Sequence, residues 1–294
     1  MKRLCSLFIV VALVALTVTG CWSGTPSTPG TVTPVATSTP ATGPSVTPTS
    51  TTPTEEQVPI NVYFSYQEKM QAVQRYAPAG TKAVLRAALD ALLQGPTEEE
   101  KTAGLTSQIP AGTTLLGLTI SDGVAYVDLN SHYDDGGGSL SMFHRIAQVV
   151  YTSTQFKTVK SVQFSMNGKR VKALGGEGVI IEKPQTRKMW EEQAPAILVE
   201  SPAWGGVVTE GSTIKGTANV FEGVFQLQLK DSSGVKLMDV TINATSGTGT
   251  RGTWTTTAKL GVTTATAGTL RVFDYSPKDG KPENVVEIPV VFER

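Results

Sequence analysis

The sequence predicts an α+β domain followed by an all-β, immunoglobulin-like sandwich. Residues 57–183 mix strand patterns with helical patterns, and residues 196–294 contain short strand patterns separated by turn residues. A polar stretch at 184–195, with a proline near each end, separates the two as a linker. The chain of 294 residues is long enough for two modest domains.

The N-terminal residues have the pattern of an export signal. Lys2 and Arg3 give a positive start, and residues 7–18 are almost wholly apolar. As a helix this run would rise about 18 Å, well short of the ~30 Å hydrocarbon core of a bilayer. We therefore interpret residues 1–20 as a signal peptide and not as a membrane span.

The end of this segment resembles the bacterial lipobox. Its last residues are Val18, Thr19, Gly20 and Cys21. The resemblance implies that the Cys21 thiol carries a diacylglycerol thioether, and two acyl chains anchor a protein stably. An ordinary secretory signal is the alternative. Cys5 is lost with the signal peptide, so the exported chain has no disulfide and no cysteine-based zinc site.

Residues 21–56 are expected to form a disordered stalk. In residues 22–54, 24 of 33 positions are Thr, Ser or Pro, and none is charged. Such a composition buries too little apolar surface to offset chain entropy. The stalk would lift the folded part away from the membrane.

The first half of the α+β domain is predicted from periodicity. Apolar residues alternate over residues 60–66, as in a half-buried strand. They then recur at three- and four-residue spacing over residues 84–92, which indicates a helix ended by Gly95. Thr97 and Glu100 form a capping box for a short second helix.

The second half of this domain is predicted in the same way. Strands at 116–120 and 124–129 flank a turn at Asp122, and a loop at 134–138 leads into a helix at 139–153. The expected buried stripe of that helix consists of Leu140, Phe143, Ala147, Val150 and Tyr151. A strand at 159–166 follows. The order β-α-β-β-α-β favours two helices on one face of a small sheet.

The second region reads as a sandwich because seven short strand patterns follow one another. They lie at 197–199, 213–216, 224–229, 236–242, 252–258, 269–273 and 285–292.

Both regions resemble known families. Five runs match the GerMN domain in the right order over roughly residues 58–182, and they lie at 92–97, 104–105, 109–113, 122–129 and 148–152. GerMN domains occur in sporulation and spore-germination lipoproteins, and the resemblance implies a fold like the ring-building motif of envelope assemblies. No catalytic residue set comes with it.

Residues 201–202, 214–218, 221–223 and 274–280 resemble the immunoglobulin-like domain of bacterial spore germination. This domain often follows GerMN in one chain, so the two resemblances support each other.

No motif predicts a catalytic or metal site. Asp128, Asn130 and His132 alternate loosely like a calcium loop, but Tyr133 stands where the EF-hand needs glycine, and the late glutamate is missing. His144 is expected to be a surface or half-buried structural histidine.

Other side chains also favour structural roles. The glycine loop at 136–138 lacks a P-loop ending, and Asp134 and Asp135 beside it would repel an anion, so Ser139 is expected to cap a helix there. Trp190, Trp204 and Trp254 are a candidate sugar-stacking platform, but packing is the commoner role of tryptophan. We expect no metal and no cofactor.

The sequence therefore predicts a non-enzymatic lipoprotein on the extracytoplasmic face of the cell membrane, anchored through Cys21. The family resemblance implies sporulation or spore germination. Expected partners are other envelope proteins or a second copy, with a cell-wall glycan as a further candidate. The formal net charge of zero gives no basic field for nucleic acid.

Two alternatives remain open at this point. The first is a lipoprotein that binds or processes peptidoglycan or carbohydrate, and enzymatic processing would need a clustered acid, base or metal set. Another is a solute-binding lipoprotein, which would need more β-α units. We also expect the fragments 57–190 and 194–294 each to fold alone.

Overall fold

The computed structural model describes residues 57–79, 83–176, 178–261 and 265–293. Internal contacts divide the chain into Met1–Thr52 and Pro53–Arg294, and every described residue belongs to the second unit. The predicted signal peptide, Cys21 and the stalk at 21–56 lie outside the described residues. Within the described residues, no helix is both long enough and apolar enough to cross a membrane.

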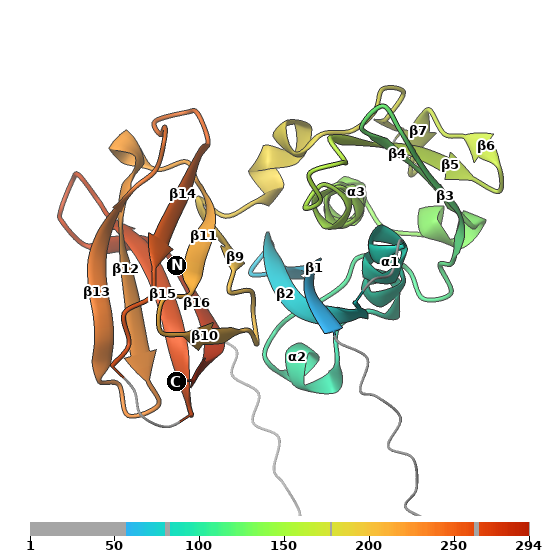
Figure 1. Cartoon of the computed structure of the whole chain (residues 1–294). Helices are drawn as coiled ribbons and strands as arrows, with labels where there is room; N and C mark the ends of the chain where they lie inside the picture. The colour runs from blue at the N-terminus through green and yellow to red at the C-terminus, as the bar shows by residue number, and fades with distance from the viewer. Residues whose placement is uncertain (1–56, 80–82, 177, 262–264, 294) are drawn as a thin grey trace, which may run out of the picture. The chain divides into compact units, whose positions relative to one another are not determined.

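The first region is α+β, as predicted (Figure 1). Its elements are β1 (Gln57–Tyr66), β2 (Lys69–Pro78), α1 (Val84–Gln94), α2 (Glu98–Thr102), β3 (Leu115–Ser121), β4 (Val124–Leu129), η1 (Ser131–Asp134), α3 (Ser139–Ser153), β5 (Ser161–Met166), β6 (Lys169–Arg170), β7 (Ala173–Leu174) and β8 (Val179–Ile180). The main sheet has the order β3-β4-β5-β6, with β4 and β5 parallel and the other pairs antiparallel.

The position of β1 differs from the prediction of a single small sheet. Among the described strands, β1 pairs with β2, which the sequence patterns did not predict, in a separate antiparallel hairpin. A single bridge also joins Ser65 of β1 to Thr106. The turn residues Gln67 and Glu68 adopt φ of 48° and 61°, without the glycine or asparagine that usually marks such a turn. β2 is buried on consecutive residues and not on alternate ones, so it lacks the period-two signal.

Helix α3 lies between the main sheet and the β1–β2 hairpin (Figure 1). It is therefore buried on nearly all sides from Met142 onward. Leu140, predicted to be buried, is 56% exposed because it lies in the first turn, ahead of this layer. The predicted cap is also one residue off, since Gly138 is the N-cap and Ser139 is already helical.

The capping box of α2 is confirmed. The Thr97 side chain accepts a hydrogen bond from the Glu100 backbone, and the Glu100 carboxylate accepts one from the Thr97 backbone. Gly95 ends α1 with φ of 79°, a conformation that glycine adopts without strain.

The second region is a two-sheet β-sandwich, as predicted. After the 3-10 helix η2 (Arg187–Gln193), its elements are β9 (Ile197–Ser201), β10 (Val207–Thr209), β11 (Thr213–Ala218), η3 (Phe221–Gly223), β12 (Val224–Asp231), β13 (Lys236–Asn243), β14 (Gly252–Thr257), β15 (Thr266–Tyr275) and β16 (Pro282–Glu293). The sheets have the orders β10-β16-β15-β12-β13 and β14-β11-β9. β10 is the one strand here that the sequence patterns did not predict.

The sandwich core is packed closely against β11. Trp254 lies opposite Gly216 and edge-on to Phe225, with ring centroids 5.3 Å apart. A Cβ atom at Gly216 would collide with the Leu198 carbonyl and with the Trp254 ring. Glycine is therefore required at this position of the strand.

The sandwich also contributes to the core of the α+β region. Leu198 and Ala203 are each 1% exposed and belong to the apolar cluster built around α1, α3 and the main sheet. The backbone of Trp204 pairs with the edge of β2 that does not face β1. It donates to the Ala72 carbonyl (2.9 Å) and accepts from the Gln74 backbone N–H (3.0 Å). The predicted linker boundary at 184–195 stays a prediction, but the two regions share part of one core.

Candidate functional site

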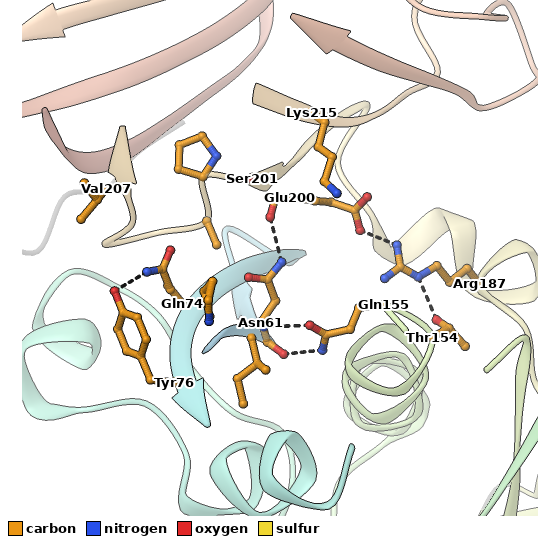
Figure 2. Close-up of a pocket in the computed structure, with 14 residues that line it drawn as sticks. Asn61, Gln74, Tyr76, Thr154, Gln155, Arg187, Glu200, Ser201, Val207 and Lys215 are labelled. Carbon is orange, nitrogen blue, oxygen red and sulfur yellow. Dashed lines mark hydrogen bonds and ion pairs between the residues drawn. The ribbon is translucent and has the colours of Figure 1, made fainter. Parts of the chain in front are cut away.

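A polar cleft of about 600 Å³ lies beside the β1–β2 hairpin and strands β9 to β11 (Figure 2). The hairpin supplies Asn61, Gln74 and Tyr76 to its lining, and the sandwich supplies Glu200 and Lys215. Its volume falls within the range of about 300–1,000 Å³ that is typical of ligand pockets. Polar side chains from both regions therefore surround one concave site.

An ion pair forms one wall of the cleft. Arg187 of η2 donates to Glu200 Oε1 at 2.5 Å, and the Tyr63 hydroxyl donates to the same oxygen at 2.7 Å. Arg187 also donates to Thr154 Oγ1 (2.8 Å) and to the Tyr151 carbonyl (3.0 Å). One guanidinium thus joins η2, the end of α3 and strand β9.

The surroundings of Glu200 favour its charged, carboxylate form. Burial by itself would raise the pKa of Glu200, but the charge of Arg187 and hydrogen bonds from Tyr63 and Arg187 lower it below its ordinary value. Burial raises the pKa of the Tyr63 hydroxyl, so this group stays a neutral donor. The network is therefore a structural clamp and offers no poised acid or base.

Two amide side chains lie next to this ion pair. The Asn61 backbone donates to Gln155 Oε1 (2.8 Å), and Gln155 Nε2 donates back to the Asn61 carbonyl (2.6 Å). Asn61 Nδ2 donates to the Glu200 carbonyl at 2.8 Å. These bonds fix β1 to the segment after α3 and to β9, as Figure 2 shows.

The candidate residues for chemistry are each bonded to a different partner. Asp128 accepts from the backbone of Gly168 at 3.0 Å, and His132 pairs with Asp135 at 2.7 Å on the surface. Asp134 accepts from the backbone of Gly175 at 2.6 Å. The described residues contain no group of three or more His, Cys, Asp or Glu able to hold a metal ion.

The glycine loop at 136–138 is organised by a buried cation. The Arg145 guanidinium donates to the carbonyls of Gly136 (3.1 Å) and Asp135 (3.3 Å), and also to the Tyr133 carbonyl. The loop therefore presents carbonyl oxygens to a resident arginine.

All three candidate tryptophans take part in packing. Trp190 is 8% exposed and lies 5.8 Å from Phe143, and Trp254 lies in the sandwich core. Trp204 packs edge-on against Tyr66 with centroids 5.2 Å apart. No flat tryptophan platform is formed by these residues.

His144 is more buried than expected. It is 4% exposed, and its Nδ1 lies 2.8 Å from Ser65 Oγ. Its Nε2 is buried and has no hydrogen-bond partner among the described residues. Burial and the nearby Lys69 lower the pKa of His144, against an opposing effect of Glu68.

We expect His144 to make the fold sensitive to acid. In the unfolded chain, the His144 side chain takes up a proton below pH about 6.5. In the folded chain, its lowered pKa opposes protonation. The contribution of His144 to the free energy of unfolding is fully present above that pH. It is lost as the pH falls toward the pKa of His144 in the folded state. In a His144→Asn variant, the decline of unfolding free energy should be shallower by up to about 1.4 kcal/mol per pH unit. Denaturant titrations between pH 4.5 and 8 measure this, and identical slopes in the two proteins would contradict it.

The main residues of the cleft were not predicted from the sequence. Arg187 lies in a stretch interpreted as linker, and Glu200 follows three apolar residues of a short strand. The one available signal was the presence of a carboxylate within that apolar strand, because a charge so placed needs a partner.

Family comparisons match both regions. The family model described as sporulation and spore germination matches residues 61–172. The model described as the immunoglobulin-like domain of bacterial spore germination matches residues 196–281. Among curated proteins, no match to the chain is found.

Several solved structures are similar in part. The first GerMN domain of the sporulation protein GerM from Bacillus subtilis is 24% identical over 45% of this chain and 98% of that one, with a TM-score of 0.38. The tandem GerMN domains of the same protein are 18% identical over 63% of this chain and 60% of that one, with a TM-score of 0.38. A candidate lipoprotein from Clostridium perfringens is 20% identical over 45% of this chain and 89% of that one, with a TM-score of 0.34.

Proposed function

Because this chain carries a domain of the sporulation and spore germination family, followed by the immunoglobulin-like domain of bacterial spore germination, we propose that it is a lipid-anchored assembly protein of the cell envelope. It acts by docking, without turnover, in sporulation or germination. Its lipid is carried on Cys21, and residues 21–56 separate the folded part from the outer face of the membrane.

The observation that carries this proposal is the free edge of β3. This strand pairs with β4 on one side and with no other described strand. Its seven residues contain no charge, and Leu116 and Ile120 are 50% and 45% exposed. Uncharged, apolar edge strands are templates for pairing with a strand of another chain.

One edge strand of the sandwich differs from β3 in its charge. Strand β13 carries Lys236 and Asp239, and its pairing with β12 contains a register shift. The sandwich edges β10 and β14 are uncharged like β3, but β10 has three residues and the exposed positions of β14 are threonines. Charges and bulges are the devices that keep an edge from pairing. β3 has a register shift near Leu115 but no charged residue.

An apolar groove is lined in part by side chains of β3. It has a volume of about 430 Å³, and its lining includes Val84, Leu118, Ile120, Phe156 and Val159. A strand added to β3 from an envelope protein or a second copy would place apolar side chains in it. Tethering to a membrane raises effective concentration, so a contact of small area supports assembly.

Ile120→Lys should remove this docking. The substitution places a charge on the free edge, and the complex captured by chemical crosslinking in cells should be lost. Val235→Lys is the matched control, since Val235 is also apolar and is 57% exposed in the β12–β13 turn. Retention of the complex in the Ile120→Lys protein, or its loss in both proteins, would count against docking through β3.

The anchor is tested separately. Cys21→Ala should abolish incorporation of a palmitate analogue and move the protein from the detergent phase to the aqueous phase. Cys5→Ala makes the same substitution in the other cysteine and should leave both properties unchanged. Label retained by the Cys21→Ala protein would refute the anchor.

A further inference from the structure

The polar cleft contains unused hydrogen-bonding capacity. Among the described residues, no hydrogen-bond partner is found for Asn61 Oδ1, Gln74 Oε1, Glu200 Oε2 or Lys215 Nζ, although all four side chains line the cleft. Figure 2 shows these side chains around one space. Three acceptors and one ammonium donor match a ligand that carries several hydroxyl groups and at least one acceptor.

The charge of the lining favours an anion. The lining holds two cations, Arg187 and Lys215, and one anion, Glu200, so one positive charge is in excess. The charge of Lys215 also helps to lower the pKa of Glu200. Lys215 is exposed and forms no ion pair with a described residue. An acidic group on the ligand would give this ammonium a charge-assisted hydrogen bond.

The cleft has an aromatic side chain at its rim. Tyr76 is 53% exposed, and its hydroxyl is fixed by a 2.5 Å hydrogen bond from Gln74 Nε2. Tyrosine combines an apolar ring with a polar tip, so it can contact the apolar face of a pyranose ring while its hydroxyl stays bonded.

The cleft also continues along the sandwich. A second cavity of about 400 Å³ shares Glu200 and Lys215 with the first and is lined by Thr245, Thr253 and Thr255. The threonine hydroxyls extend the polar lining beyond Lys215. An extended ligand therefore fits better than a single small anion.

From these features we infer that the cleft binds an acidic saccharide, with sugar hydroxyls donating to Glu200, Asn61 and Gln74 and a carboxylate facing Lys215. The site is built by the β1–β2 hairpin, β9 and β11 together. It lies on elements other than β3, so the proposed docking does not depend on it.

The probe is the disaccharide of N-acetylglucosamine and N-acetylmuramic acid, which carries one carboxylate. The full chain in detergent should bind it in calorimetry, and the side-chain NH₂ resonances of Asn61, Gln74 and Gln155 should shift in NMR. Lys215→Gln should weaken binding by about tenfold or more. Tyr76→Ala should weaken it by about three- to tenfold.

The controls separate a specific site from general attraction. Lys259→Gln removes the same charge from another exposed lysine of the sandwich and should leave binding unchanged. The neutral disaccharide of two N-acetylglucosamine units should bind about tenfold more weakly than the acidic one. No binding, equal binding of the two disaccharides, or equal effects of Lys215→Gln and Lys259→Gln would overturn the inference. Crosslinking through β3 should be the same in the Lys215→Gln protein, whichever result is obtained.

Discussion

Replacing Glu200 with alanine is expected to lower the free energy of unfolding by about 2–4 kcal/mol. The change leaves the Arg187 guanidinium and the Tyr63 hydroxyl without their shared acceptor. The side chains of Arg187 and Glu200 are only 25% and 20% exposed, so water replaces the lost carboxylate poorly. Chemical denaturation followed by circular dichroism measures the loss.

The matched control is an exposed ion pair. Glu98 pairs with Lys101 at 2.7 Å, but its side chain is 86% exposed. Glu98→Ala should therefore cost less than about 0.5 kcal/mol. Equal losses in the two variants would mean that the contacts of Glu200 contribute no more than a surface pair.

Leu198→Ala is expected to lower the free energy of unfolding by about 2–5 kcal/mol. Leu198 belongs to sandwich strand β9, yet its side chain is 1% exposed within the core of the α+β region. Because both regions use this core, we expect them to unfold together in one transition, at a lower denaturant concentration than the unsubstituted chain.

Val235→Ala is the control for this substitution. Val235 is 57% exposed, so its truncation should change stability by no more than about 0.5 kcal/mol. Two separate transitions, with only the sandwich affected by Leu198→Ala, would show that the regions are independent. In that case the fragments 57–190 and 194–294 should each fold alone, as the sequence suggests. If one transition is observed, we expect fragment 57–190 to be destabilised, because it lacks Leu198 and Ala203.

Elements with a clean period were predictable from the sequence. Helix α1 shows its core stripe at Leu85, Leu89 and Leu92, and β4 shows strict alternation of buried residues. Capping of α2 followed from Thr97 and Glu100 alone, because both partners of the box lie within one turn. Local signals of this kind need no knowledge of tertiary contacts.

Elements defined by tertiary contacts were not predictable in this way. β2 has buried Gln71 among its residues because the strand is covered on both sides, and this removes the alternating pattern. Leu140 fits the stripe of α3 by period, yet it lies outside the layer that covers the helix.

The candidate site depends on distant pairs. Arg187 and Tyr63 are 124 positions apart, and Arg187 and Glu200 are 13 positions apart. No local pattern connects them, so their meeting in one cleft appears only in the folded chain.

Photocrosslinking at position 120 tests whether the protein docks through the free edge of β3. A photoreactive amino acid replaces Ile120 in the full, lipid-anchored chain, and cells are irradiated during sporulation or germination. Docking through β3 predicts covalent adducts with another envelope protein or with a second copy, and far weaker adducts when Val235 is replaced instead. Absence of adducts at position 120, or equal adducts at both positions, would contradict it.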